Sequence, residues 1–532
     1  MRDSQGTAWA VVRLTARLIR RSTLLTALAL GGYAAIEMSV IEASYPDDAS
    51  RAALMAFGDF PVLRVMQGVP YSVETGALAA WDSGWMMSLV VGAWAITTTA
   101  RTLRGDEDEG RAEVVLAYPA RASRVLACQV ATLVFAGGVL GAAVGVAMAA
   151  SGAPVVGSLL FGAVIAGFCA AFVAFTALAA QVFASRTQAL GLAAGMLGAA
   201  LVLRMAANSA DSRGWLSWVT PMGWSDRLQP FGDDRTAVLL VPTIVVAGLV
   251  GCAVALRVRR DSRTGLVPER GARPSRAWGL TSPLAFAWRA NLGVLLTWAI
   301  AIAAWGLATG ALVPTVNDFV AADPAFRDIL AGMGMNVSDL SKGYVGMTAT
   351  LAGVALSVFA ALRMGAARAE ESSTRLDHVM TRSVRRRRWL AGHVLLTLVS
   401  VLLLTVIAGA ASWGGAVAMG ADLSIRDTMA AALNTVPVAV VFGGLAVLVL
   451  GLAPRATVIA SASAAVLAYV LTLVGPALSW PDVVVGASPF WHLNAVPVEA
   501  VDPTIALALV AIGAVAAAIG MVTFERRDLV GA

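Results

Sequence analysis

Residues 125–185 form one continuous run that contains no Asp, Glu, Lys or Arg. A membrane-spanning helix needs about 20 mostly apolar residues, so this run is long enough for more than one span. The segment 151–154, with Gly152 and Pro154, supplies the break between two helices. The whole chain shares this character, because 58% of its residues are hydrophobic and 14% are charged, against about 25% charged residues in soluble proteins. The sequence therefore predicts a membrane protein.

Other charge-free runs extend this prediction to twelve transmembrane helices and an all-α polytopic membrane protein. The predicted spans are residues 22–42, 81–100, 125–149, 155–184, 187–206, 236–256, 289–312, 344–362, 389–412, 428–453, 456–478 and 503–524. The first run follows Arg17, Arg20 and Arg21, as the core of a signal peptide would, but no convincing cleavage site follows it. We therefore predict a retained first helix.

The basic residues predict the orientation of these spans. Membrane proteins retain Lys and Arg on the cytoplasmic side, and 30 of the 39 Lys and Arg residues lie in alternate connecting segments or at the adjoining helix ends. These segments include both ends of the chain. We expect a multi-pass protein of the cytoplasmic (plasma) membrane with both termini in the cytoplasm.

The two halves of the chain repeat one another. Six pairs of positions agree at one constant offset along the chain: Arg104 with Arg368, Glu107 with Glu371, Arg111 with Arg375, Val115 with Val379, Arg121 with Arg385 and Arg124 with Arg388. Each half has six predicted spans, an even number, so both halves have the same orientation in the membrane. We predict a first six-helix half at 1–260, a cytoplasmic linker at 261–282 and a second six-helix half at 283–532, with a cavity at their pseudo-two-fold seam.

The repeated segments 101–124 and 363–388 are too polar to cross a membrane and are predicted to be short cytoplasmic helices. Glu107 and Arg111 are four residues apart, as are Glu371 and Arg375, so each pair can meet on one helical face. Such a helix in each half could dock a soluble ATPase; the alternative is that its arginines only contact anionic headgroups. The docking candidates are Arg104, Glu107, Glu109, Arg111, Arg121, Arg124, Arg368, Glu370, Glu371, Arg375, Arg385 and Arg388.

No energy source is apparent in the chain itself. A P-loop requires a lysine after glycine, and the single lysine, Lys342, does not follow one. Ionisable residues well inside the spans are limited to Glu37 and Arg204, which gives ion coupling little support. We find no catalytic or metal-binding pattern. The chain is therefore predicted to be a transport subunit without its own cofactor, powered by another polypeptide.

These motifs resemble a known family. The blocks RGDEDEGRAE at 104–113, LAYP at 116–119 and RRRRWLAGH at 385–393 resemble the membrane permeases of ABC-2-type exporters, in particular the fused twelve-span kind associated with polyketide antibiotic (tetronasin-like) export. The resemblance covers essentially the whole chain. It implies that 104–124 and 368–388 are coupling helices, each seated in a groove of one of two ABC ATPase subunits, which bind ATP and Mg.

The resemblance also implies short re-entrant helices at 208–235 and 480–502, near the outer surface. Pro221, Trp224, Pro489 and Trp491 in these segments are candidates for an outer gate. Tryptophan collects at membrane interfaces in general, so interfacial anchoring is the alternative interpretation.

A further set of residues could line the substrate path: Glu37, Trp94, Arg204, Trp298, Trp305 and Phe359. A carboxylate inside a span is costly unless it faces water, a partner or a cavity, and aromatic rings can stack on large hydrophobic guests. The alternatives are packing or lipid contact for the aromatic residues. For Glu37 the alternatives are contact with the membrane–water interface or an ion pair with Arg204.

The sequence as a whole predicts the permease of an ATP-driven ABC exporter that moves hydrophobic small molecules, such as antibiotics or drugs, out of the cell. Its predicted partners are two copies of a cytoplasmic ABC ATPase and the lipid bilayer, with no nucleic acid. An ion-coupled efflux carrier of the major-facilitator type and a non-transporting subunit of an envelope complex are the alternatives. The loop pattern typical of major-facilitator carriers fits residues 105–111 poorly.

Overall fold

The computed structural model describes residues 2–56, 58, 61–108, 110, 113, 121–259, 265–266, 283–314, 340–372 and 385–527. These residues contain helices and no strand, and eleven of the helices are long and apolar enough to cross a membrane. This confirms the prediction of an all-α polytopic membrane protein. The predicted span 81–100 lies in α4 (Thr75–Ala100), which is not among the eleven. Most of α4 is buried among other helices, so it tolerates residues such as Asp82 that a lipid-facing helix would exclude.

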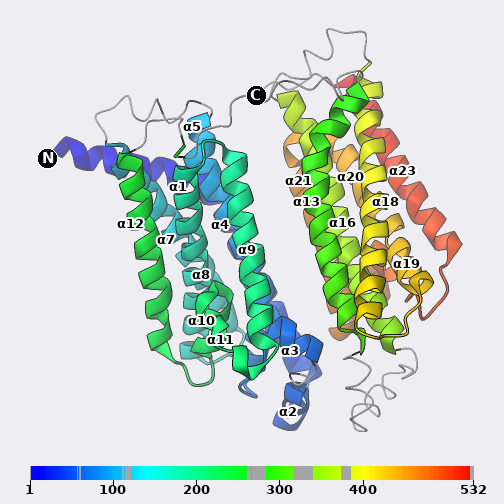
Figure 1. Cartoon of the computed structure of the whole chain (residues 1–532), viewed down its shortest axis with the longest axis horizontal. Helices are drawn as coiled ribbons and strands as arrows, with labels where there is room; N and C mark the ends of the chain where they lie inside the picture. Colours follow the sequence, from blue (N-terminus) through cyan, green and yellow to red (C-terminus); the bar gives the residue numbers. More distant parts are fainter. Residues whose placement is uncertain are drawn as a thin grey trace. The chain divides into compact units, whose positions relative to one another are not determined.

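The described chain divides into two compact units, Met1–Arg273 and Pro274–Ala532, which we call unit 1 and unit 2 (Figure 1). The boundary falls within the segment 261–282, for which the sequence predicts a linker. All of that segment except residues 265–266 lies outside the described residues.

Unit 1 is built around one central helix. Its long helices are α1 (Arg2–Ser44), α4, α7 (Ala122–Ala150), α8 (Val155–Val182), α9 (Arg186–Asn208) and α12 (Leu240–Val258). Helix α8 contacts α4, α7, α9 and α12, while α1 packs against α7 and α4. With 43 residues, or about 65 Å of helix, α1 is longer than a bilayer core of about 30 Å and begins well before the predicted span.

Shorter helices lie at the two ends of unit 1. The π-helical turn η2 (Arg101–Gly105) and α5 (Asp106–Asp108) follow α4. Helices α2 (Asp48–Ala56) and α3 (Pro61–Gln67) follow α1, while α10 (Leu216–Val219) and α11 (Trp224–Leu228) lie between α9 and α12. Figure 1 shows α5 at one end of the unit and the other four short helices at the opposite end.

Unit 2 repeats this arrangement. Its helices are α13 (Pro283–Ala311), α16 (Leu340–Ser372), α18 (Arg386–Ala418), α19 (Ile425–Asn434), α20 (Val436–Leu452), α21 (Thr457–Ala477), α22 (Asp482–Val485) and α23 (Pro503–Arg526). The contacts α13–α18, α16–α20, α16–α21 and α20–α23 correspond to α1–α7, α4–α8, α4–α9 and α8–α12. One difference stands out: the predicted span 428–453 is broken into α19 and α20 just before Pro437, whereas α8 is continuous.

Arginine distinguishes the two ends of each unit. We call the end with η2 and the C-terminus of α12 the basic end of unit 1, and the end with the last turn of α16, the start of α18 and the end of α23 the basic end of unit 2. The opposite end of each unit is its distal end. If both termini lie in the cytoplasm as predicted, the basic ends are the cytoplasmic ones.

Glycine allows a close helix contact in unit 2. Helices do not gain hydrophobic energy by pairing within lipid, so membrane helices rely on small residues that let their backbones approach. A Cβ on Gly444 of α20 would lie 2.1 Å from the carbonyl oxygen of Gly513 of α23. A Cβ on Gly520 would lie 2.4 Å from the carbonyl oxygen of Val447. The α20–α23 pair therefore depends on bare backbone at these positions.

We expect Gly444→Ala to lower the stability of the protein by about 1–3 kcal/mol, because the added methyl group meets backbone that cannot yield without moving a helix. Gly293→Ala is the matched control, since a Cβ on Gly293 meets nothing within 4 Å. Thermal unfolding in detergent measures both changes. A melting temperature for Gly444→Ala equal to that of Gly293→Ala would show that the helices are not in backbone contact.

Candidate functional site

The basic end of unit 1 holds a buried ion cluster. Arg104 is fully buried, and its guanidinium donates to the carbonyl oxygen of Ala180 at 2.7 Å and to the carboxylate of Glu107 at 2.6 Å. The other carboxylate oxygen of Glu107 lies 2.9 Å from Arg257. Ala180 belongs to α8 and Arg257 to α12, so this cluster ties together the ends of the second, fourth and sixth spans.

Unit 2 has a corresponding cluster at its basic end. The guanidinium of Arg527 donates to both carboxylate oxygens of Glu371, each at 2.7 Å. Arg368 donates to the carbonyl oxygen of Arg455 at 3.5 Å. Arg455 follows α20, and Arg527 follows α23, so the same three spans are joined as in unit 1. The repeat found in the sequence therefore extends to tertiary contacts.

The clusters change the interpretation of three docking candidates. The side chain of Arg104 is 0% exposed, and those of Glu107 and Glu371 are each 6% exposed. All three are held by residues of their own unit, so they are not available to a partner in this conformation. Sequence spacing did not reveal this, because Glu107 also binds Arg257 and Glu371 binds Arg527, each at the end of a distant helix.

The remaining docking candidates fall into three groups. Arg121, Arg124, Arg385 and Arg388 are exposed. Arg368 and Glu370 are half-buried, and Glu370 lies 3.5 Å from the ring of His393. Three candidates lie outside the described residues: Glu109, Arg111 and Arg375. The predicted pairs of Glu107 with Arg111 and of Glu371 with Arg375 therefore stay predictions.

Arg204 forms a clamp at the distal end of unit 1. Its guanidinium donates to both carboxylate oxygens of Asp226 at 2.9 Å, to the carbonyl oxygen of Met66 at 2.8 Å and to that of Gln67 at 2.6 Å. Arg204 is 3% exposed. These four bonds hold α3 and α11 against α9. In this conformation Arg204 joins elements of unit 1, and its place in a substrate path stays a prediction.

Glu37 lies beside another acid rather than beside Arg204. Its carboxyl group, on α1, is buried and lies near the carboxyl group of Asp82 on α4. Asp82 accepts a hydrogen bond from the amide of Gln67 at 2.7 Å. Asp82 is thus connected through Gln67 to the Arg204 clamp.

The distal segments of the two units share one detail. The hydroxyl of Thr220 donates to the carbonyl oxygen of Ala200, and that of Ser488 donates to the carbonyl oxygen of Ala468, both at 2.7 Å. Donor and acceptor are separated by the same distance along the chain in both units. The gate candidates Pro221 and Pro489 follow these hydroxyl residues directly and are half-buried.

The two gate tryptophans occupy different surroundings. Trp224 is 4% exposed, and its indole N–H donates to the carbonyl oxygen of Trp218 at 3.2 Å. Trp491 is 41% exposed. The tryptophans are therefore not equivalent, although both follow a proline in matching segments.

The aromatic candidates for the substrate path also lie in different surroundings. Trp94 is buried in the core of unit 1. In unit 2 the rings of Trp298 and Phe359 meet edge to face, with 5.4 Å between their centroids, and Phe359 is fully buried. These three residues pack helices together. Trp305, by contrast, lines a cavity in unit 2.

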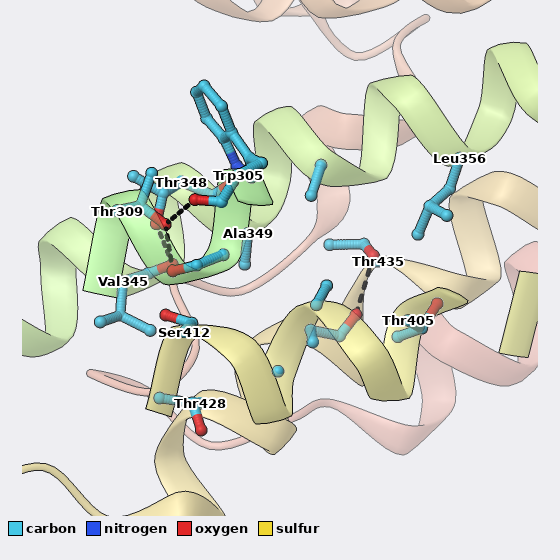
Figure 2. Close-up of a pocket in the computed structure, with 15 residues that line it drawn as sticks. Trp305, Thr309, Val345, Thr348, Ala349, Leu356, Thr405, Ser412, Thr428 and Thr435 are labelled. Atoms are coloured by element: carbon cyan, nitrogen blue, oxygen red, sulfur yellow. Dashed lines mark hydrogen bonds between the residues drawn. The ribbon is translucent and has the colours of Figure 1, made fainter. Parts of the chain in front are cut away.

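This cavity lies between α13, α16, α18 and α19, and Figure 2 shows polar side chains gathered around it. Six hydroxyl residues line it: Thr309, Thr348, Thr405, Ser412, Thr428 and Thr435. We call it the hydroxyl cavity. Our sequence analysis did not identify these residues. A signal was present, because Thr405 and Ser412, and likewise Thr428 and Thr435, are seven residues apart and so share one helical face.

Comparison with known proteins places these features in a family. A family model described as "Multidrug efflux system permease Rv1217c, C-terminal domain" matches residues 11–257 and 280–525. The multidrug efflux system permease protein Rv1217c of Mycobacterium tuberculosis is 30% identical to the chain over 531 residues, which cover 98% of this chain and 94% of the relative.

We expect Glu107→Gln to destabilise unit 1 by about 3 kcal/mol or more, because it leaves Arg104 and Arg257 buried without their counter-charge. Glu371→Gln has the corresponding effect on unit 2 through Arg527. Glu74→Gln, at an exposed carboxylate, is the control and leaves stability unchanged. Thermal unfolding of the purified variants measures the effect. Equal melting temperatures for Glu107→Gln and Glu74→Gln would rule out a structural role for the cluster.

Proposed function

Because the chain belongs to the family of multidrug efflux system permeases, we propose that it is the transmembrane subunit of an ATP-driven exporter of the ABC-2 type. In this proposal it moves hydrophobic small molecules, such as antibiotics or drugs, out of the cell across the cytoplasmic membrane. The observation that carries the proposal is the matched pair of basic ends, each stiffened by a buried ion cluster and each bearing exposed arginines.

The exposed arginines are the proposed docking points for two copies of a cytoplasmic ATPase. Arg121 and Arg385 lie at the residues that precede α7 and α18, at matching positions of the two units. Arg124 and Arg388 lie one turn later and are also exposed. This places one basic, accessible surface on each unit, to which one ATPase subunit would bind. ATP and Mg would be bound by these partners.

The buried clusters provide a route for force from the docking surface into the membrane. Each cluster joins the ends of the second, fourth and sixth spans of its unit by charge-assisted hydrogen bonds, which are stronger than neutral ones. A partner that displaces the basic end would therefore move these spans together rather than one at a time. Such joint movement is what alternation between inward- and outward-facing states requires.

The resemblance to permeases for polyketide antibiotics of the tetronasin type supports antibiotics as one substrate class. The proposed orientation, with both termini and both basic ends in the cytoplasm, follows from the retention of basic residues on that side. It places the Arg204 clamp at the outer surface, where α3 and α11 would border the exit.

One observation favours a second candidate function, an ion-coupled efflux carrier. Glu37 and Asp82 place two acidic side chains close together inside unit 1, and ionisable groups within spans often belong to proton pathways. Unit 1 lacks an evident route from this pair to the basic end among its described residues, since the contacts of the pair lead to Gln67 and the distal clamp. We therefore favour ATP as the energy source.

Charge reversal should separate docking from stability. We expect the variant Arg121→Glu/Arg124→Glu, and likewise Arg385→Glu/Arg388→Glu, to lose co-purification with a P-loop ATPase from native membranes while keeping the wild-type melting temperature. Arg213→Glu/Arg426→Glu is the control, because these exposed arginines lie at the distal ends. Full retention of the ATPase by both reversed pairs would contradict the proposed docking surface.

The energy source can be tested in inverted membrane vesicles that contain the chain and its co-purified partner. We expect uptake of ethidium to require ATP, to stop with vanadate, and to continue when a protonophore removes the pH gradient. Asp82→Asn should leave ATP-dependent uptake within about twofold of wild type. Uptake that needs the pH gradient and is lost in Asp82→Asn would instead establish the ion-coupled carrier.

A further inference from the structure

The wall of the hydroxyl cavity carries oxygen atoms and no charge. Its six hydroxyl residues come from α13, α16, α18 and α19 and from Thr435, which follows α19. The other residues of the lining are apolar or glycine, apart from Trp305. The cavity is therefore a polar but uncharged surface inside an otherwise apolar group of helices.

The hydrogens of five of these six hydroxyl groups are already committed. Five threonines donate to a backbone carbonyl of the preceding turn, at 2.9 Å for Thr309, 3.1 Å for Thr348, 2.9 Å for Thr405, 3.1 Å for Thr428 and 2.8 Å for Thr435. The indole N–H of Trp305 donates to the carbonyl oxygen of Thr348 at 3.4 Å. A hydroxyl that donates its hydrogen keeps its lone pairs. The cavity wall therefore offers acceptors.

The chain is irregular where the cavity meets the break between α19 and α20. Proline has no N–H, so Pro437 cannot continue the helical hydrogen bonds of α19, and the carbonyl of Leu433 accepts a backbone N–H at the cap of α19 instead. Ala432 and Thr435, next to this break, both line the cavity. Irregular backbone at membrane depth is tolerated where it lines a cavity or is buried in protein. The corresponding helix of unit 1, α8, has no such break.

The size of the cavity limits what it can hold. Its volume of about 20 Å³ is enough for one water-sized group. A whole drug molecule does not fit in this conformation, but a single amino or hydroxyl group does. Because the wall accepts hydrogen bonds, a group with N–H or O–H hydrogens is favoured over a group of the same charge without them.

We propose that unit 2 binds the hydrogen-bond-donating head group of an amphipathic molecule in the hydroxyl cavity, a primary amine above all. The ring of oxygen atoms would accept the N–H hydrogens of the head group, while its apolar remainder would lie outside the cavity. The identification of this ligand as an exported substrate rests on the proposed function; the binding preference itself does not.

Two ligands that differ only in donor hydrogens test the proposal. Dodecylamine and dodecyltrimethylammonium have the same alkyl chain and the same charge at neutral pH, but the second has no N–H. Binding of each radiolabelled compound to the full chain in lipid nanodiscs is measured, with empty nanodiscs subtracted. Thr309→Val/Thr348→Val removes two acceptors with little change in shape, and Thr309→Ser/Thr348→Ser keeps both hydroxyl groups.

We expect the wild type and the serine variant to prefer dodecylamine. The valine variant should bind dodecylamine about tenfold or more weakly, the usual cost of hydrogen bonds lost to a charged group, with binding of dodecyltrimethylammonium unchanged. Equal binding of the two compounds by the wild type, or equal weakening of both in the valine variant, would overturn the proposal. Thr428→Val, on another helix, provides the same comparison if the double variant loses its thermal transition.

This assay needs neither ATP nor a partner, so its outcome is independent of the export test. A preserved preference for the amine without ATP-dependent export would count against the proposed function alone. ATP-dependent export of both compounds, with equal binding, would count against the head-group site alone.

Discussion

A charged or hydrogen-bonding group inside a bilayer is tolerated only where protein satisfies its bonds and balances its charge. This constraint explains two buried networks of unit 1. The guanidinium of Arg104 is enclosed by a carboxylate and a carbonyl oxygen, and that of Arg204 by Asp226 and two carbonyl oxygens. Each of these networks joins elements far apart in the sequence. The hydrogen bonds that balance the buried charge therefore also hold these elements against one another.

The two units retain some features of the repeat and have lost others. Both keep an acid after the second span that binds an arginine at the end of the sixth, and both keep a hydroxyl that bonds to the fifth span at the distal end. The fourth span differs, because it is continuous in α8 and broken before Pro437 in unit 2. These two contacts are thus retained in both copies, while the fourth spans have diverged.

This division of roles suits an exporter with two similar halves. Matching basic ends allow two identical ATPase subunits to act on the two units in the same way, which is the arrangement proposed above. Different interiors allow each unit to present different chemistry to a substrate. Unit 1 offers a pair of acidic side chains near a distal clamp, and unit 2 offers an uncharged, acceptor-lined cavity with room for about one water-sized group. The glycine contacts between α20 and α23 stabilise unit 2, and none of these glycines lines the hydroxyl cavity.

The helical class, the approximate positions of the spans and the repeat between the two halves could all be determined from the sequence. Hydropathy and charge along the chain report directly which segments face lipid and which face water. The exposure of each arginine could not be found in this way: Arg104 and Arg121 look alike as residues of one basic segment, yet one is buried and the other exposed. The hydroxyl cavity could not be found from the sequence either, because its residues come from four helices and are spread between Trp305 and Thr435. Both depend on how each helix is rotated about its axis and which distant helix it meets, and only the packing of the folded units decides this.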